Sequence, residues 1–300
     1  MAVIVTGNFS NFLVEGATKA FGAAVPQYPT VYTRFAEVRS SDKNAEDYTM
    51  VSGLGMAVEK TQGSVVEMDT MRQQFTKRFQ HVTYGLGFSI TQEAIEDNQS
   101  EEIAVMRARE LKLALMKRKE VVVNALLNNA DSSSYTLADG VKLLSTAHPT
   151  LAGNQSNVLA TAADLSEASL ESLLINVRKV KDHRGVAMAA MPVQLIVPAE
   201  SEHAALRIVM SSHRSSDSTN AINTMNGRFP KGVLVNPFMT DTDMWLVQTD
   251  VPNGVIVFNR RPMTLSQDGD HDTDVMKFKG TERYVAGTAD WRCLFGSPGA

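Results

Sequence analysis

The sequence contains a single cysteine, Cys293. A lone thiol excludes an intrachain disulfide framework and a zinc site built from cysteines, and it fits a reducing compartment. The sequence also lacks any run of about 18 consecutive apolar residues, and no basic cluster precedes a leader-length apolar segment near its start. We therefore expect neither membrane insertion nor export, and we interpret Cys293 as a small core or interface residue.

Basic residues do not outnumber acidic ones either. Lys and Arg number 29 against 33 Asp and Glu, a formal net charge of -4, which argues against a dedicated nucleic-acid binder and leaves only local contacts with a polyanion. Apolar residues make up 43% of the chain and charged residues 21%, which is ordinary for a globular protein. A length of 300 residues favours about two domains with a sizeable core.

Motifs of common active sites are also absent: the sequence holds no GxGxxG or GxxxxGKS/T phosphate loop, no HExxH and no CxxC. One stretch, LLSTAHPTLAGNQSN, does place Ser145 three residues before His148. Catalysis would need their side chains within about 3 Å of each other. No GxSxG elbow surrounds the serine, and Pro149 favours an extended backbone that points side chains three residues apart to opposite faces. We predict a structural loop, with a hydrolase using Ser145 and His148 as the weaker alternative.

Residues 266–274, SQDGDHDTD, contain four aspartates and one histidine. A calcium loop of the EF-hand type needs its glycine at the sixth ligand position and a glutamate at the twelfth, and Gly269 comes too early for that pattern. We therefore predict an acidic turn between two strands rather than a metal site, and no cofactor.

Strand patterns dominate the first third of the chain. Residues 48–70 are rich in Gly, Val and Thr around a turn at residues 61–63, which predicts a long hairpin. Residues 82–90 alternate apolar and polar side chains, the period of a strand with one buried face, and His81 is expected to be solvated or at an interface. Residues 1–35 show no sustained period and are interpreted as an arm that packs on something else.

A long helix is predicted over residues 100–129, with Ser100 available as N-cap. It would be about 45 Å long, and it would have well over twice the usual number of about 11 residues in a helix. We therefore expect it to span a whole domain. Its apolar stripe consists of Ala104, Ala108, Leu111, Leu115, Val122 and Leu126. Its basic residues are Arg107, Arg109, Lys112, Lys117, Arg118 and Lys119, diluted by Glu110 and Glu120. A solvated face is the simpler interpretation of these charges, and a surface that meets a polyanion is the sharper one.

The second half mixes helices and strands. A helix is predicted over residues 165–183, and a buried strand that runs into another helix over residues 192–212. Residues 211–230 are small and polar and are expected to form an exposed, mobile loop. The remaining segments are mainly strands punctuated by turn residues, so the order of elements favours an α+β fold with a discontinuous main domain.

Six segments occur in a characteristic order: GLGFSITQEAIEDNQ, DGVKLLSTAHPTLAGNQSN, SEASLESLLINVRKVKDHRG, PVQLIVPAESEHAALRIVMSS, DTDMWLVQT and DWRCLFGS. Together they resemble the major capsid proteins of tailed bacteriophages, which have the Hong Kong 97 type fold, and most closely the Mu-like major head subunit group. The resemblance runs from about Tyr48 to the C-terminus, and it rests on the order and spacing of the segments.

The resemblance implies a division into an N-terminal arm (1–40), an extended loop (41–90), a peripheral domain with the long spine helix (91–185 and 256–300) and an axial domain (186–255). It implies a non-enzymatic subunit that assembles with itself into the pentamers and hexamers of an icosahedral shell around double-stranded DNA. Scaffolding protein, portal and decoration proteins are the further partners expected, with scaffolding as a separate protein. The expected location is the virion, after assembly in the cytoplasm of a host bacterium.

The resemblance also gives roles to individual residues. Arg107, Arg109 and Lys112 become candidates for DNA contact, and Lys60, Phe75, Phe79 and His148 become candidates for contacts between subunits. Family members that crosslink covalently use a lysine in the extended loop, where Lys60 lies, but no asparagine partner is matched and no such crosslink is predicted. A related shell that encloses protein cargo in a bacterial cell is the remaining alternative.

Overall fold

The computed structural model describes residues 7–23, 28, 30–91, 93, 100–213, 221–270 and 275–300. The helices among them are α1 (Gly7–Gly22), α3 (Ser100–Asn128), α4 (Glu167–Lys179) and α5 (Glu202–Met210), with 3-10 turns η1 (Tyr32–Arg34), η2 (Ala199–Ser201) and η3 (Trp291–Cys293). The strands are β1 (Glu37–Ser40), β2 (Ala45–Val51), β3 (Gln73–Gln80), β4 (Val82–Thr91), β5 (His148–Thr150), β6 (Gly153–Gln155), β7 (Pro192–Val197), β8 (Val233–Val235), β9 (Trp245–Thr249), β10 (Val255–Asp270), β11 (Val275–Thr288) and β12 (Leu294–Ser297).

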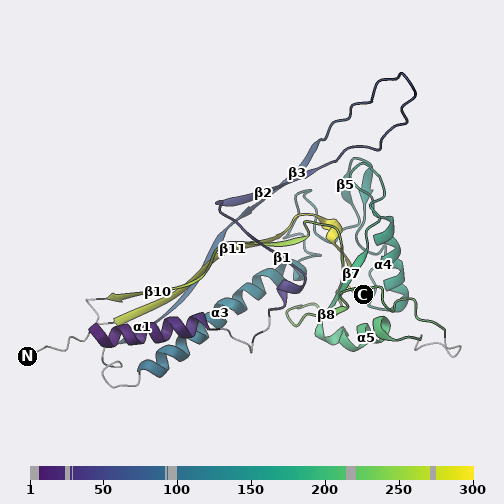
Figure 1. Cartoon of the computed structure of the whole chain (residues 1–300). Coiled ribbons are helices and arrows are strands. Elements are labelled where there is room, and N and C mark those ends of the chain that lie inside the picture. The colour runs from purple at the N-terminus through teal and green to yellow at the C-terminus, as the bar shows by residue number, and fades with distance from the viewer. Residues whose placement is uncertain are drawn as a thin grey trace, which may run out of the picture.

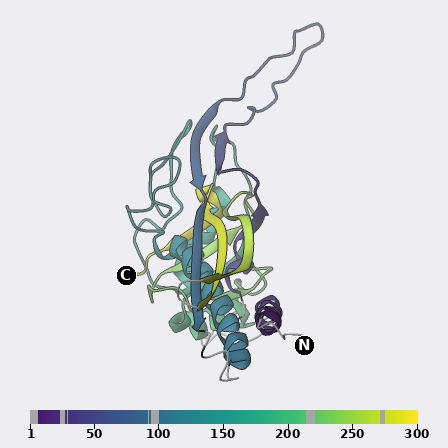
Figure 2. The ribbon, with the colours of Figure 1, turned by 90° about the vertical axis from the view of Figure 1, so that its left-hand side faces the viewer.

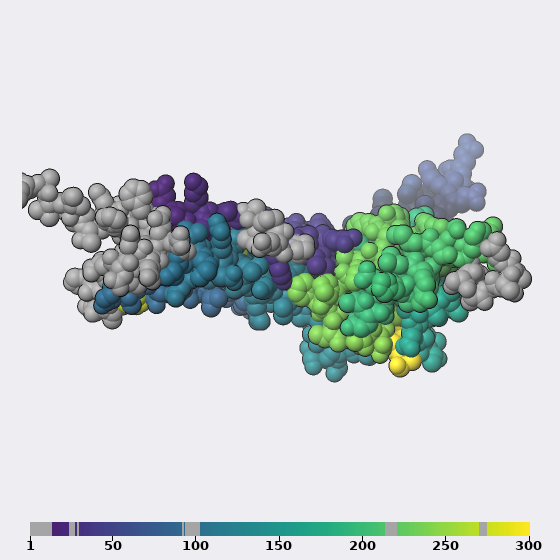
Figure 3. Space-filling model, turned by 90° about the horizontal axis from the view of Figure 1, so that it is seen from below, coloured from purple at the N-terminus to yellow at the C-terminus, as the bar shows by residue number. Residues whose placement is uncertain are grey.

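The described part of the chain has three regions (Figure 1). A rounded body holds α4, α5, β7 and β8, a long sheet with α1 and α3 extends away from it, and the hairpin of β2 and β3 projects from both. Viewed from below, the long region and the body follow one another along an elongated molecule (Figure 3). The fold is α+β, as the order of segments predicts.

The long helix α3 confirms the predicted spine to within one residue. Its buried face begins with the expected alanines and leucines and continues through Val123, Leu126 and Leu127, whereas Val122 is only half-buried. The face moves to Val123 because this residue follows Leu115 and Lys119 at intervals of four along the helix. Lys119 is itself buried, so one basic side chain lies within the apolar stripe.

The sheet beside α3 has the strand order β1, β10, β11, β4. Strands β10 and β11 pair antiparallel, with Asp270 opposite Val275, so the predicted acidic turn does connect two strands; its residues 271–274 lie outside the described residues. The segments DVMKFKG and RYVAG, at residues 274–280 and 283–287, suggest two separate strands, whereas β11 is continuous through Gly280. A Cβ at Gly280 would lie 2.8 Å from Leu115 Cδ1, so glycine there lets α3 approach the sheet.

Helix α1 is absent from the sequence prediction, which found no period in residues 1–35. It packs along α3, where Ala17, Ala20 and Phe21 join one buried cluster with Ala104 and Ala108. The apolar face of α1 is too short and too interrupted by glycine to stand out locally, and it is buried only because α3 covers it.

The predicted hairpin is present, but most of its strand pairing lies at its base, in β2 and β3, rather than within residues 48–70. Strands β2 and β3 pair antiparallel at its base, and the turn at Thr61 is confirmed by the hydrogen bond that Ser64 N donates to Thr61 O at 3.1 Å. Residues 52–60 and 65–72 form no strand. Figure 2 shows the hairpin from the side, rising clear of the rest of the chain.

Strand β4 confirms the predicted strand but not its burial. Ile90 is buried, whereas Val82 and Leu86 are about half exposed, because β4 is the edge of its sheet. His81, expected on a solvated or interface position, is instead buried, and its Nε2 lies 3.1 Å from Ser41 Oγ.

The body is built on a second sheet, with the order β12, β9, β7, β8. Helix α4 is confirmed within the predicted range, and its Leu170, Leu173 and Val177 share a core with Trp245 of β9 and Phe295 of β12. The predicted division assigns α4 and β12 to another domain than β7 to β9, but β12 pairs with β9 and α4 packs against β12, so both belong structurally with that sheet. Met225 and Phe229 join the same core, which corrects the expectation of a wholly exposed segment 211–230; residues 214–220 lie outside the described residues.

Candidate functional site

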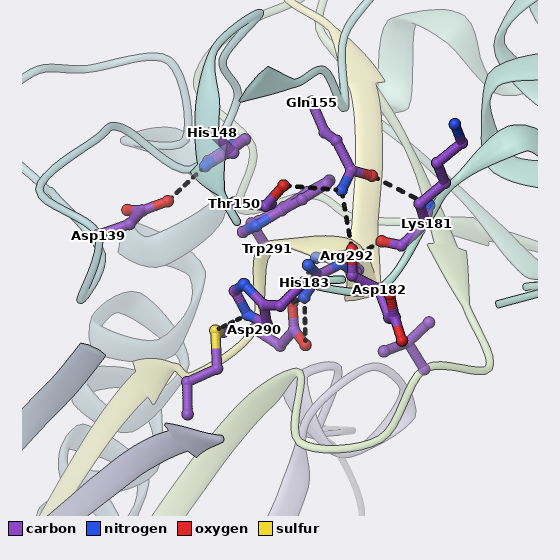
Figure 4. Close-up of polar contacts among 12 residues, drawn as sticks. Asp139, His148, Thr150, Gln155, Lys181, Asp182, His183, Asp290, Trp291 and Arg292 are labelled. Atoms are coloured by element: carbon purple, nitrogen blue, oxygen red, sulfur yellow. Dashed lines mark hydrogen bonds and ion pairs between the residues drawn. The ribbon is translucent and has the colours of Figure 1, made fainter. Parts of the chain in front are cut away.

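The histidine-proline loop closes on a buried polar cluster (Figure 4). His148 Nδ1 lies 2.7 Å from Asp139 Oδ2, and its Nε2 lies 3.2 Å from Leu143 O. The imidazole stacks on Trp291, with ring centroids 4.5 Å apart and planes inclined by 3°. Both partners of the ring are acceptors, so both contacts are hydrogen bonds only when the ring carries two protons.

Ser145 lies close in sequence but has different partners. Its backbone N donates to Asn157 Oδ1 at 2.9 Å, and its Oγ accepts from Ala147 N at 3.2 Å. The fully buried Asn157 also donates to Leu143 O at 2.7 Å and to Leu294 O at 2.9 Å, which ties the loop to β12. No hydrogen bond joins Ser145 to His148 within the described residues, in agreement with the extended backbone at Pro149.

His148 was a candidate for contact with a neighbouring subunit, and the structure argues against that role. Its side chain is 0% exposed, and its partners all belong to the same chain. The sequence predicted the loop but not the partners of His148, because only the tertiary fold brings Asp139 and Trp291 to the ring.

A second buried group lies beside the first, in the segment after α4 (Figure 4). His183 Nε2 lies 2.6 Å from Met50 Sδ of β2, and Arg292 Nε donates to Lys181 O at 3.0 Å. Burial lowers the pKa of His183 below its ordinary value, and the positive charge of Arg292 lowers it further. His183 is therefore a neutral ring packed at the base of the projecting hairpin.

Arg184 connects the body to that hairpin. Its Nη1 lies 2.7 Å from Asp69 Oδ2, and its Nη2 donates to Thr70 O at 2.7 Å. The same Asp69 oxygen accepts from Gly55 N at 2.7 Å, so the two branches of the hairpin are joined at one carboxylate. Hydrogen bonds from Gly55 N and Thr70 N, followed by Arg184, hold the pKa of Asp69 below its usual range.

The hairpin beyond this contact exposes apolar side chains. Between residues 54 and 71 their exposed fractions range from 57% to 92%. This hairpin patch consists of Leu54, Met56, Val58, Val65, Val66, Met68 and Met71. Burying them would be favourable by about 25 cal/mol per Å² of apolar surface, so the patch is a ready contact surface for a protein.

The other expected contact residues divide into exposed and buried ones. Lys60 is exposed near the tip of the hairpin and Phe75 is half-buried in β3. Phe79 is buried against Phe258, at 6.0 Å between ring centroids, and covers Gly287 of β11. Phe79 therefore anchors the hairpin to its own sheet, which contradicts its expected role between subunits.

The basic side chains of α3 do not form one uniform face. Arg107 Nη1 donates to Ser89 O at 3.1 Å, Lys112 Nζ donates to Ala23 O at 2.5 Å, and Arg109 is exposed. These contacts leave the charges near solvent, so a polyanion remains an available partner.

Lys119 and Glu120 are exceptions to the expected solvated face, since both are buried. Glu120 accepts from Val31 N at 2.7 Å and from Tyr32 N at 3.1 Å, which holds the N-terminal segment against α3. Lys119 lies 2.5 Å from Glu282 Oε1. The sequence carries no local signal for either contact, because the partners are far away along the chain.

Over the described ranges, no three His, Cys, Asp or Glu side chains are grouped so as to hold a metal ion. None of the described helices combines the length and the apolar character needed to cross a bilayer.

A family model and solved structures both match the chain. The sequence model of a family described as phage capsid protein matches residues 74–296. No curated protein sequence matches the chain. Solved structures with a similar fold include the virus-like particle from Pyrococcus furiosus, with a TM-score of 0.53 and 13% identity over 98% of this chain and 100% of that chain.

Two further structures are similar. The capsid of the native GTA particle has a TM-score of 0.59 and 12% identity over 91% of this chain and 90% of that chain. The procapsid of bacteriophage JBD30 has a TM-score of 0.51 and 16% identity over 98% of this chain and 76% of that chain. At such identities the likeness concerns the fold alone.

Proposed function

The chain belongs to the phage capsid protein family, and from this premise we propose that it is the major subunit of an icosahedral phage head, assembling into pentamers and hexamers around double-stranded DNA. The hairpin patch is the observation that carries the proposal. A second copy of the chain is its natural occupant, because a closed shell surrounds every subunit with copies of the same chain and builds its stability from many modest contacts. The Mu-like group stays a prediction.

The parts of the subunit fit this use. We assign residues 1–40 to an arm, the hairpin within 41–90 to an extended loop, and α3 with the long sheet to a peripheral region. The body is the axial unit, to which we add β12 because it pairs with β9, and α4 because it packs against β12. A projecting hairpin with no core of its own gains most of its stability from a partner.

We propose that the subunit is not a catalyst. Ser145 lacks a base, since both ring nitrogens of His148 face Asp139 and Leu143 O. A hydrolase built on Ser145 and His148 would need the loop to rearrange. If replacing His148 by Ala removed a measurable hydrolytic activity, the non-catalytic assignment would be wrong.

Further partners belong to the same proposal. A scaffolding protein, a portal and decoration proteins would bind the shell, and the exposed basic side chains of α3 would meet packaged DNA without sequence preference. Family membership places the protein in the virion, and we propose that assembly takes place in the cytoplasm of the host bacterium. A shell that encloses protein cargo is the second candidate.

Electron microscopy tests the proposal directly. The protein would be expressed with and without a candidate scaffolding protein, and purified particles would be imaged and analysed for nucleic acid and protein content. We expect closed shells made of pentamers and hexamers. Persistent monomers under assembly conditions would contradict the shell, and particles filled with enzyme rather than DNA would support the cargo shell.

The role of the hairpin patch has its own test. Replacing Met56 and Met68 together by Ser should prevent shell formation while leaving the melting temperature of the free subunit unchanged, because neither side chain packs in its own chain. Met210→Ser is the matched control, since Met210 is similarly exposed on α5. Normal assembly of the double variant would remove the patch from the proposal.

A further inference from the structure

A lysine, an asparagine and a glutamate meet between α3 and the long sheet. Lys119 Nζ of α3 lies 2.9 Å from Asn259 Oδ1 of β10 and 2.5 Å from Glu282 Oε1 of β11. Lys119 is 7% exposed and Glu282 is 4% exposed. The amine and the carboxylate are therefore buried, and the half-buried carboxamide of Asn259 contacts the amine.

Aromatic rings enclose the same group. Lys119 Nζ lies 4.8 Å from the ring centroid of Tyr284 and 5.8 Å from that of Tyr32. Burial, with smaller contributions from Glu282 and Glu120, raises the pKa of Tyr32 to about 12, and burial also raises the pKa of Tyr284. Both phenols are therefore neutral at neutral pH. Exclusion of water favours attack by an amine over hydrolysis of the carboxamide.

One oxygen of the Glu282 carboxylate has no hydrogen-bond partner among the described residues. Glu282 Oε1 contacts Lys119, whereas no hydrogen bond from the described residues reaches the buried Oε2 of Glu282. A buried ion pair with an unsatisfied oxygen is a costly arrangement.

We propose that Lys119 and Asn259 form an isopeptide bond within the chain, with Glu282 as the proton carrier. Glu282 accepts one proton from the Lys119 ammonium, and the neutral Nζ attacks Cγ of Asn259. The tetrahedral intermediate collapses as the Cγ–Nδ2 bond breaks. A second proton passes from Nζ to Nδ2, ammonia leaves, and one hydrogen remains on the new amide nitrogen. Glu282 ends protonated and can donate to Asn259 Oδ1, and no oxidant or reductant is needed.

The position of the amine beside the carboxamide favours the rate of bond formation. The hydrogen bond to Oδ1 holds the amine next to the carboxamide, so that a small shift of Nζ toward Cγ replaces a bimolecular encounter. The bond would join residues that are 140 positions apart in the sequence and would fasten α3 to β10. It differs from a crosslink between subunits, because all three groups belong to one chain and the lysine is on α3 rather than on the hairpin.

Mass spectrometry of proteolytic peptides tests the bond, on the purified subunit and on assembled particles. We expect one linked species that joins the peptide of Lys119 to the peptide of Asn259, with a mass lower than their sum by one ammonia. Lys119→Arg, Asn259→Ala and Glu282→Gln should each abolish it. Lys142→Arg is the matched control and should retain it, since Lys142 pairs with Asp131 at 2.6 Å and has no asparagine contact among the described residues.

The wild-type protein alone decides between the two states if a variant fails to fold. Unlinked Lys119 and Asn259 peptides in both subunit and particles would overturn the proposal and leave a buried ion pair. A linked species that persists in Glu282→Gln would overturn the role of Glu282.

Discussion

Arg184 and Asp69 join the projecting hairpin to the body of the subunit, with Arg184 Nη1 2.7 Å from Asp69 Oδ2. The contact lies near solvent, yet it fixes the direction of a segment that otherwise touches little of its own chain. Exposed ion pairs contribute little to global stability, so the effect of this one is expected in the position of the hairpin.

Arg184→Ala should release the hairpin without unfolding the subunit. Residues 52–72 should be cleaved severalfold faster in limited proteolysis, because the segment opens more often, while the melting temperature changes little. Arg178→Ala, an exposed arginine of α4, is the control and should resemble the wild type. Equal cleavage of both variants would show that other contacts orient the hairpin.

His148→Ala should destabilise the subunit strongly. It removes a buried ring that stacks on Trp291 and leaves Asp139 without its hydrogen-bond partner, and a buried polar group left unsatisfied costs about 1–3 kcal/mol in addition to the lost packing of the ring. Ser145→Ala removes one hydrogen-bond acceptor and should cost about 1 kcal/mol. Chemical unfolding of both variants measures the difference, and similar costs would contradict the structural role of His148.

Acid should destabilise the subunit partly through His183. Because its pKa is lower in the folded state than the ordinary value of 6.5, the unfolded chain binds the proton first as pH falls. The neutral His183 ring therefore contributes its full stabilisation above pH 6.5. This stabilisation is lost as the pH falls below 6.5 and passes the lower pKa that His183 has in the folded state.

His183→Gln tests that contribution. The variant should lose less stability than the wild type between neutral and mildly acidic pH, as measured by melting temperature against pH. The exposed His203 of α5 provides the control variant, His203→Gln, whose profile should follow the wild type. Parallel profiles for all three proteins would rule out His183 as an acid-sensitive group.

Gly287→Ala should weaken the attachment of the hairpin to the sheet. The added Cβ would lie 2.1 Å from Phe79 Cε1, and overpacking of this kind costs about 1–3 kcal/mol. Gly269→Ala, on the same pair of strands, meets nothing within 4 Å and is the control. Equal melting temperatures of the two variants would contradict the tight seat of Phe79.

Arg109→Gln should alter DNA retention through charge alone, since Arg107 and Lys112 also hold backbone carbonyls. The salt dependence of genome release should become shallower by about one charge for each arginine that no longer neutralises a phosphate. Arg207→Gln, on α5 in the body, is the control. Retention that does not change with salt in either variant would remove α3 from the DNA-facing surface.

The order of elements could be predicted from the sequence because it is written in local patterns. The period of α3, the turn at Thr61 and the alternation in β4 each depend on neighbouring residues, and the segment order predicted the family. The missed helix α1 shows the limit, since its apolar face has meaning only against α3.

The sequence by itself determined most helices, strands and turns, with α1 as the exception, because backbone preferences and hydrophobic periods act over a few residues. Only the tertiary structure decided which polar side chains are buried. Lys119, Glu120, His81 and His148 look like solvated or interface residues in the sequence, yet each is buried. Their partners come from distant segments, as Glu282 does at 163 positions from Lys119, and a buried charge or imidazole is stable only where such a partner is in place.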